Sequence, residues 1–184
     1  MMTIDRRSML GAPLALAAVG ATFADEDKAN TVILTTKNGK VVIKLRPDLA
    51  PKHVERIKAL VKRKFYDGLV FHRVIAGFMA QTGDPTGTGS GGSDLPDLPA
   101  EFSKEPFKRG TLGMARAQSP NSANSQFFIC FAESSFLNGQ YTVFGEVTSG
   151  MEVVDLIKKG SQDDNGSVND PDKIATMRMA SDAQ

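Results

Sequence analysis

Hydrophobic and polar residues recur with recognisable periods along most of the chain. β-Branched residues over 31–34 and 40–45 flank a turn that contains Asn38-Gly39, a pair favoured in type I′ turns, so a β-hairpin is predicted there. Over residues 51–64, apolar positions recur with a helical period and basic residues lie between them. This pattern predicts an amphipathic helix with a proline in its first turn.

Between residues 69 and 147 the pattern changes to short apolar runs separated by clusters of Gly, Pro, Asn and Ser. The runs fit β-strands joined by surface loops, and they are 69–75, 78–81, 111–116, 126–131 and 142–147. A second helix is predicted over 151–158, followed by Gly160 as its C-terminal glycine, and a last strand over 173–179. The polar segment 161–172 has no periodicity that predicts a structure. Many strands and two helices favour a mainly β fold, a closed antiparallel β-barrel capped by the helices.

The N-terminal residues 1–24 have the pattern of a cleavable export signal. Arg6-Arg7 precede an apolar run over 9–24 that is shorter than the ~20 residues needed to span a bilayer. The arginine pair resembles a bacterial twin-arginine signal, and an ordinary Sec signal is the alternative. Cleavage is expected after Ala24 or, second, Ala21, and an uncleaved anchor stays open. We expect an exported, periplasmic protein.

The remaining chain is predicted to be a short linker over 25–30 and one domain over 31–184. With 184 residues, of which 41% are hydrophobic, the chain can bury a core of ordinary size. Residues 25–184 carry equal numbers of acidic and basic side chains, which gives little support to nucleic-acid binding. One cysteine excludes an intrachain disulfide and a thiolate-rich metal site.

Several motifs look chemical but have a simpler interpretation. Residues 87–92 match G-x-G-x-x-G, but Pro85 precedes them and Pro96 follows, so no helix N-terminus is predicted to bind a pyrophosphate. A flexible glycine-rich loop is the simpler interpretation. No G-x-S-x-G elbow marks a serine hydrolase.

The two histidines and the cysteine do not form a predicted metal site. His53 is interpreted as an exposed helix position and His72 as a buried strand residue, and no second ligand lies near either in sequence. Cys130 lies in an apolar run and is interpreted as a buried small hydrophobe. We therefore expect no metal and no cofactor.

An arginine inside an apolar strand is the most informative single residue. A buried guanidinium is costly unless it is paired or functional. Strict alternation puts Arg73 on the same face as Phe71 and Ile75, while Gln81 shares a face with Met79. Such a face predicts an apolar pocket with a few fixed polar groups, the usual composition of a ligand site. The alternative is an exposed sheet edge with a solvated arginine and a Phe-rich core behind it.

Four segments together resemble the cyclophilin family of peptidyl-prolyl cis–trans isomerases, in its compact bacterial form. The similarity runs from about Val32 to Met179. The motifs are F-H-R-V-I from Phe71, G-F-M-x-Q-x-G-D from Gly77, N-S-x-x-S-Q-F-F-I from Asn121 and V-F-G-x-V from Val143. The resemblance implies an eight-stranded barrel capped by two helices. It also implies a groove for an extended peptide whose proline enters an apolar pocket.

The resemblance assigns roles to individual residues. Arg73 matches the catalytic arginine of the family. The remaining matches are the proline-pocket walls Phe78, Met79, Phe128 and Leu137, the polar groups Gln81 and Gln126, the backbone-pairing Ala115 and Ala117, and the groove-lining Gly89.

Three further substrate-binding positions depart from the best-known members. Tyr141 replaces a common His, Phe136 a common Trp and Arg116 a common Asn. Phe136 has no indole N–H to donate, so the resemblance leaves tight cyclosporin binding open. Arg116 can still pair through its backbone.

The resemblance implies isomerisation of Xaa-Pro bonds, with proline-containing peptides and unfolded exported proteins as partners. A proline-peptide-binding chaperone module without turnover is the alternative, and a scaffold subunit of an envelope complex is a weaker third. We expect a monomer that binds no nucleic acid and has no stable membrane insertion after signal cleavage.

Overall fold

The computed structural model describes residues 27–182, so the predicted signal and the start of the linker lie outside the described residues. The elements are β1 (Thr31–Thr36), β2 (Gly39–Leu45), α2 (Pro51–Lys62), β3 (Arg73–Ile75), β4 (Met79–Thr82), β5 (Thr111–Met114), β6 (Phe127–Cys130), η1 (Ser135–Leu137), β7 (Val143–Ser149), α3 (Met151–Asp155), β8 (Thr176–Met179) and η2 (Ala180–Asp182). Among these elements, no helix is both long and apolar enough to cross a membrane.

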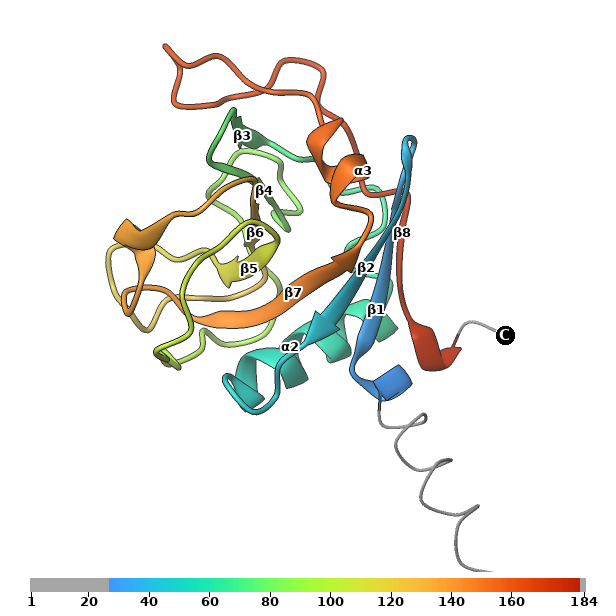
Figure 1. The fold of residues 1–184 in the computed structure, drawn as a ribbon, viewed down its shortest axis with the longest axis vertical. Coiled ribbons are helices and arrows are strands. Elements are labelled where there is room, and N and C mark those ends of the chain that lie inside the picture. Colours follow the sequence, from blue (N-terminus) through green and yellow to red (C-terminus); the bar gives the residue numbers. More distant parts are fainter. Residues whose placement is uncertain (1–26, 183–184) are drawn as a thin grey trace, which may run out of the picture.

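The strands form one curled antiparallel sheet in the order β3-β4-β6-β5-β7-β2-β1-β8 (Figure 1). The expectation of eight antiparallel strands is confirmed, but the expectation of a closed barrel is wrong. The edge strands β3 and β8 do not pair with each other. The segments that precede them meet only at an isolated bridge between Val70 and Lys173 and at a few backbone hydrogen bonds such as Phe71 N–H to Asp172 O. These two edge strands are short and irregular segments lead into them, so the sheet stays an open half-barrel.

The β1–β2 hairpin turns one residue earlier than predicted. Thr36 pairs with Gly39, so Lys37 and Asn38 form the two-residue loop. Neither loop residue has a positive φ, which a type I′ turn would require at both positions. Gly39 instead begins β2 with φ +140°, a conformation that glycine adopts readily.

Helices α2 and α3 pack on different parts of the sheet (Figure 1). α2 contacts β7 and β8, while α3 contacts β2. Val54, Ile57, Leu60 and Val61 of α2 are buried, as its periodicity predicts, and Pro51 occupies the first turn. α3 is shorter than predicted, and Gly160 does not cap it. The Gly160 N–H donates instead to Val74 O at 2.8 Å.

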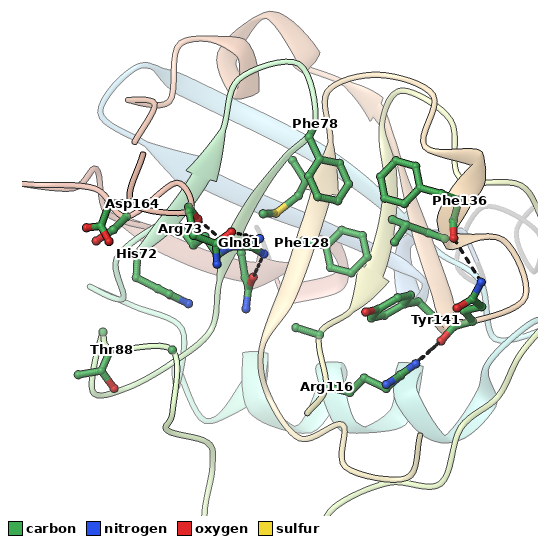
Figure 2. Close-up of a pocket in the computed structure, with 18 residues that line it drawn as sticks. His72, Arg73, Phe78, Gln81, Thr88, Arg116, Phe128, Phe136, Tyr141 and Asp164 are labelled. Atoms are coloured by element: carbon green, nitrogen blue, oxygen red, sulfur yellow. Dashed lines mark hydrogen bonds between the residues drawn. The ribbon is translucent and has the colours of Figure 1, made fainter. Parts of the chain in front are cut away.

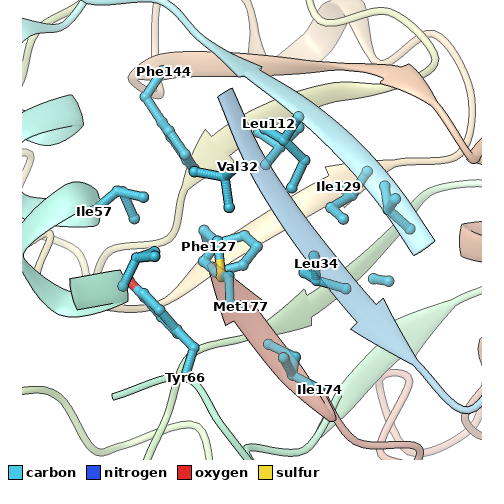
Figure 3. Packing of buried hydrophobic residues seen from close by; sticks show 14 of the residues in the cluster. Val32, Leu34, Ile57, Tyr66, Leu112, Phe127, Ile129, Phe144, Ile174 and Met177 are labelled. Carbon is cyan, nitrogen blue, oxygen red and sulfur yellow. The ribbon is translucent and has the colours of Figure 1, made fainter. Parts of the chain in front are cut away.

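The interior of the half-barrel is filled by one apolar cluster (Figure 3). Phe127 and Phe144 meet edge to face with ring centroids 6.0 Å apart, and Tyr66 meets Phe127 at 5.5 Å. Phe71 lies in this interior cluster together with Val74. The prediction that Arg73 shares a face with Phe71 is therefore wrong. Strand β3 begins only at Arg73, and the residues before it are not in a regular strand.

His53 is fully buried, which corrects the prediction of an exposed helix position. Its Nδ1 lies 2.6 Å from Glu101 Oε2, and the Lys52 and His53 N–H groups donate to the same carboxylate. Burial lowers the pKa of His53, and the Glu101 carboxylate opposes that shift. Glu101 thus caps the first turn of α2, which has no side-chain cap of its own.

Candidate active site

A second apolar cluster lies apart from the interior one and forms the floor of a surface cavity of about 860 Å³ (Figure 2). Its buried members are Met79, Phe107, Phe128, Cys130, Leu137 and Val143. Met79 is 1% exposed, Phe128 5% and Leu137 7%, so each shows little surface to the cavity. A cavity with such a floor and polar groups at its side suits a small apolar ring.

One row of residues crosses the sheet beneath this cavity. Arg73 on β3 lies opposite Gln81 on β4, Gln81 lies opposite Phe128 on β6, and Phe128 lies opposite Gly113 on β5. Residues directly opposite each other in an antiparallel sheet project from the same face. The guanidinium, the amide and the aromatic ring are therefore placed together by strand register.

Gly113 is a site residue that sequence reasoning missed. A Cβ at this position would collide with the Phe128 ring and would lie 2.7 Å from Phe107 Cε1. The absent side chain leaves the space in which Phe128 stacks on Phe107, with centroids 5.8 Å apart. The glycine inside an otherwise apolar strand was the available signal, since such a glycine marks a close approach.

The guanidinium of Arg73 is held on two sides. Nη1 donates to Gln81 Oε1 at 3.2 Å, Nε donates to Asn165 O at 3.0 Å, and Nη2 donates to Asn165 Oδ1 at 2.9 Å. Partial burial lowers the pKa of Arg73 from its ordinary value of 12.5, but an arginine remains charged at neutral pH. Of the five N–H groups of a guanidinium, one on Nη1 and one on Nη2 have no partner among the described residues and can donate to a ligand.

Gln81 is itself oriented by a second glutamine. Its Nε2 donates to Gln126 Oε1 at 2.9 Å, and Gln126 Nε2 donates to the carbonyls of Gly89 and Gly91 at 2.9 and 2.8 Å. A continuous hydrogen-bonded chain therefore joins Arg73 to the glycine-rich loop. Gln126 does not line the cavity, and its contribution to the site is the hydrogen bond that orients Gln81.

The glycine-rich loop over 87–92 is joined to a buried carboxylate by several hydrogen bonds. Asp84 is 1% exposed. It accepts hydrogen bonds from the N–H groups of Thr86, Thr88, Gly89 and Gly91 and from the Thr86 hydroxyl. Burial alone would raise the pKa of Asp84, but these donors outweigh it and lower the pKa to about 2.

Aromatic side chains form the opposite rim of the cavity (Figure 2). Phe136 is 64% exposed and packs on Phe78 with centroids 5.1 Å apart. Tyr141 meets Phe128 edge to face at 6.0 Å, and the Arg116 guanidinium lies 4.5 Å from the Tyr141 ring centroid. Arg116 also donates to the Gln140 carbonyl. This rim exposes apolar surface beside the Arg116 charge, which has no acidic partner within residues 27–182.

The structure brings most of the predicted site residues to this one cavity. Those that line it are Arg73, Phe78, Met79, Gln81, Gly89, Ala115, Arg116, Phe128, Phe136, Leu137 and Tyr141. Ala117 does not line it, and the Ala117 N–H already donates to Ser122 Oγ at 2.9 Å. The Ala115 N–H donates to Gln126 O, while the Ala115 carbonyl has no partner among residues 27–182. Ala115 can therefore offer a peptide its carbonyl alone.

Other lining residues were not predicted from the sequence. They are His72, Gly87, Thr88, Gln140, Asp164, Asn165 and Ser167. Most are sequence neighbours of predicted residues, so proximity was a usable signal. The exceptions lie in the polar segment 161–172, whose sequence has no pattern from which its position beside Arg73 could be read.

Within the described residues, no group of three or more His, Cys, Asp or Glu side chains is placed to share a metal ion. Cys130 is buried as predicted, and burial raises the pKa of its thiol to about 12. Burial lowers the pKa of His72. This site offers a charged donor, Arg73, together with an oriented glutamine amide and an apolar hollow.

Known proteins that resemble this chain agree on one family. The family model described as cyclophilin type peptidyl-prolyl cis-trans isomerase/CLD matches residues 31–179. A Brucella suis protein named "Probable peptidyl-prolyl cis-trans isomerase" is 55% identical over 196 aligned residues, which cover 100% of both chains.

Solved structures share the fold. The crystal structure of the cyclophilin AquaCyp293 from Hirschia baltica superposes with a TM-score of 0.75 at 28% identity, covering 92% of this chain and 82% of that one. A cyclophilin type isomerase from Cryptosporidium parvum, crystallised in the presence of the dipeptide Ala-Pro, gives 0.74 at 30% identity, covering 81% and 98%.

Proposed function

This chain belongs to the cyclophilin-type peptidyl-prolyl cis–trans isomerases, and we propose that it rotates Xaa-Pro bonds by donating from Arg73 to the prolyl nitrogen. A binding module without turnover is not favoured, because the relatives are named isomerases. Its partners are proline-containing peptides and unfolded proteins, on which it acts as a monomer.

The observation that carries this proposal is the position of Arg73 beside the apolar floor. The planar Xaa-Pro amide shares its nitrogen lone pair with the carbonyl, so rotation meets a barrier of ~18–20 kcal/mol. At the twisted transition state the nitrogen becomes pyramidal and regains the lone pair. A donor aimed at that nitrogen stabilises the transition state more than the planar ground state, which is the requirement for catalysis. The unpartnered N–H groups of Arg73 are suited to this donation.

The rate acceleration that this mechanism has to supply is modest. Uncatalysed isomerisation takes about 10–100 s. Reaching about milliseconds needs a factor near 10⁴, or roughly 5–6 kcal/mol. Met79, Phe128 and Leu137 contribute by holding the proline ring while the preceding carbonyl swings. The apolar floor also favours the twisted amide, because the planar amide is more polar and loses more on leaving water.

The test of this function is exchange between the cis and trans forms of a short Xaa-Pro peptide, followed by NMR. We expect the purified chain at micromolar concentration to raise the exchange rate at least 100-fold over the uncatalysed rate. Peptide binding with an unchanged exchange rate would contradict the proposal and select the binding-module alternative.

We further propose that the protein is exported to the bacterial periplasm by the twin-arginine route and assists the folding of exported proteins there. Arg6-Arg7 followed by the apolar run supports this proposal. Replacing both residues, Arg6→Lys with Arg7→Lys, is expected to leave most of the protein in the cytoplasm at precursor size. Cell fractionation with immunoblotting measures this retention.

Lysine keeps the positive charge that a Sec signal needs, so the double substitution separates the two routes. Undiminished export of the double variant would contradict the twin-arginine route. Retention of the unsubstituted chain in the cytoplasm would contradict export itself.

A further inference from the structure

The polar segment over 160–167 lies against the open edge of the sheet, beside Arg73. Gly160 N–H donates to Val74 O at 2.8 Å, and Val74 N–H donates to Gly166 O at 2.8 Å. Ser167 forms an isolated bridge with Arg73 itself. The segment therefore covers the edge strand β3 with backbone hydrogen bonds, in the way that exposed sheet edges are commonly protected.

Gly166 shows how closely this segment approaches β3. It has φ +81°, and a Cβ built there would lie within 3.2 Å of the Val74 backbone and closer still to the Ile75 side chain. No other residue type would fit without displacing the segment. The residue before it, Asn165, is consequently fixed relative to the strand that carries Arg73.

We infer that Asn165 is the positioning residue for Arg73, selecting which guanidinium N–H groups face the substrate. This inference rests on the function proposed for Arg73. Asn165 accepts from Nε through its main-chain oxygen and from Nη2 through its side-chain oxygen. Together with Gln81 on Nη1, these contacts leave one N–H on each terminal nitrogen for the prolyl nitrogen.

The backbone of Asn165 suits this double contact. Its φ is +50°, in the left-handed region that asparagine tolerates better than most residues. In this conformation the main-chain carbonyl and the side-chain amide oxygen of Asn165 both face the Arg73 guanidinium. The two contacts hold Nε and Nη2 together, so rotation of the guanidinium about its own axis is restricted.

The test compares Asn165→Gly with Asn169→Gly. Glycine accepts φ +50° without strain and keeps the main-chain acceptor, so Asn165→Gly removes only the side-chain contact. Asn169 lies two residues beyond this segment and is exposed, and its side chain makes no hydrogen bond among residues 27–182, so the same chemical change there is a matched control. We expect Asn165→Gly to lower kcat about 5-fold with KM changed less than 2-fold, and Asn169→Gly to leave both unchanged.

Two further measurements separate positioning from a structural effect. Solvent exchange of the Arg73 Nη2–H groups, one of which loses its Asn165 Oδ1 acceptor, should rise severalfold in Asn165→Gly and not in Asn169→Gly when followed by NMR. In an Arg73→Lys background, Asn165→Gly should have no further effect on kcat, because the guanidinium that Asn165 orients is absent.

An unchanged kcat in Asn165→Gly, or an equal loss in both backgrounds, would overturn the inference. Unaltered Nη2–H exchange would overturn it as well. The exchange measurement reports on Arg73 without turnover, so it judges the positioning even if the proposed role of Arg73 in the reaction fails.

Discussion

Arg73→Ala is expected to lower kcat/KM for an Xaa-Pro peptide by roughly 100-fold, most of it in kcat. Removing one hydrogen-bond donor from a preorganised site costs about 10²–10³ in rate in other enzymes, and here the total acceleration required is only about 10⁴. The loss falls on kcat because the N–H groups bind the pyramidal nitrogen, which exists only at the twisted transition state. NMR exchange at several peptide concentrations separates kcat from KM.

Two comparison variants make the result specific. Arg73→Lys keeps the charge but cannot bond Gln81 and Asn165 while also donating to substrate, so we expect it to recover only a minor part of the loss. Arg63→Ala removes a surface arginine whose partner is Asp94, and it should leave the rate unchanged. Full activity of Arg73→Ala would rule out donation from Arg73.

Asp84→Ala is expected to destabilise the fold by about 3 kcal/mol and to raise KM several-fold. The substitution removes a buried carboxylate that accepts from the N–H groups of Thr86, Thr88, Gly89 and Gly91, so the loop loses four backbone hydrogen bonds to a charged acceptor at once. KM rises because Gly89 and its neighbours line the cavity. Urea unfolding measures the stability, and peptide titration measures KM.

The control for this prediction is Asp94→Ala, which removes an exposed carboxylate from the same segment and should cost less than about 0.5 kcal/mol. Asp84→Asn should not restore stability, because its amide must direct an NH₂ group at N–H donors. A stable Asp84→Ala variant with unchanged KM would show that the loop does not depend on this carboxylate.

The pH dependence of stability follows from the same residue. The folded-state pKa of Asp84 is lowered to about 2, below the 3.8 of an unperturbed aspartate. The charged form is therefore favoured in the folded state, and its contribution of roughly 2–3 kcal/mol is complete above pH 4–5. It is lost as the pH falls from about 4 to about 2, so acid unfolding of the unsubstituted protein should steepen there and be shallower in Asp84→Asn.

The row that carries the site could be predicted from sequence because its determinants are local. Arg73 interrupts an apolar strand, and Gln81 and Phe128 lie in strands with strong apolar patterns. The motifs around them carried the resemblance to the family and, through it, the assignment of these three residues to one groove. The register observed for β3, β4 and β6 then places these side chains on one face.

Long-range contacts decide the features that the sequence did not predict. His53 is polar and was therefore interpreted as exposed, whereas the structure buries it and pairs it with Glu101, 48 residues away. Asn165 lies in a polar segment whose conformation depends on backbone bonds to Val74, and such bonds leave no trace in hydrophobic periodicity. The hydrophobic pattern predicts the number of strands well but not how short the edge strands β3 and β8 are. A closed barrel was therefore expected where the sheet stays open.

The turn between β3 and β4 has a consequence for how this protein can change over generations. Side chains alternate along a strand, so one residue inserted between Ile75 and Met79 would offset Arg73 from Gln81 and present Ala80 to the cavity in its place. An insertion or deletion here would take Arg73 and Gln81 out of register, whereas a point change at Phe136 or Asp164, which line the cavity, leaves that pair in place. Peptide preference can therefore change through substitutions at the cavity rim, while the length of this turn has to stay constant.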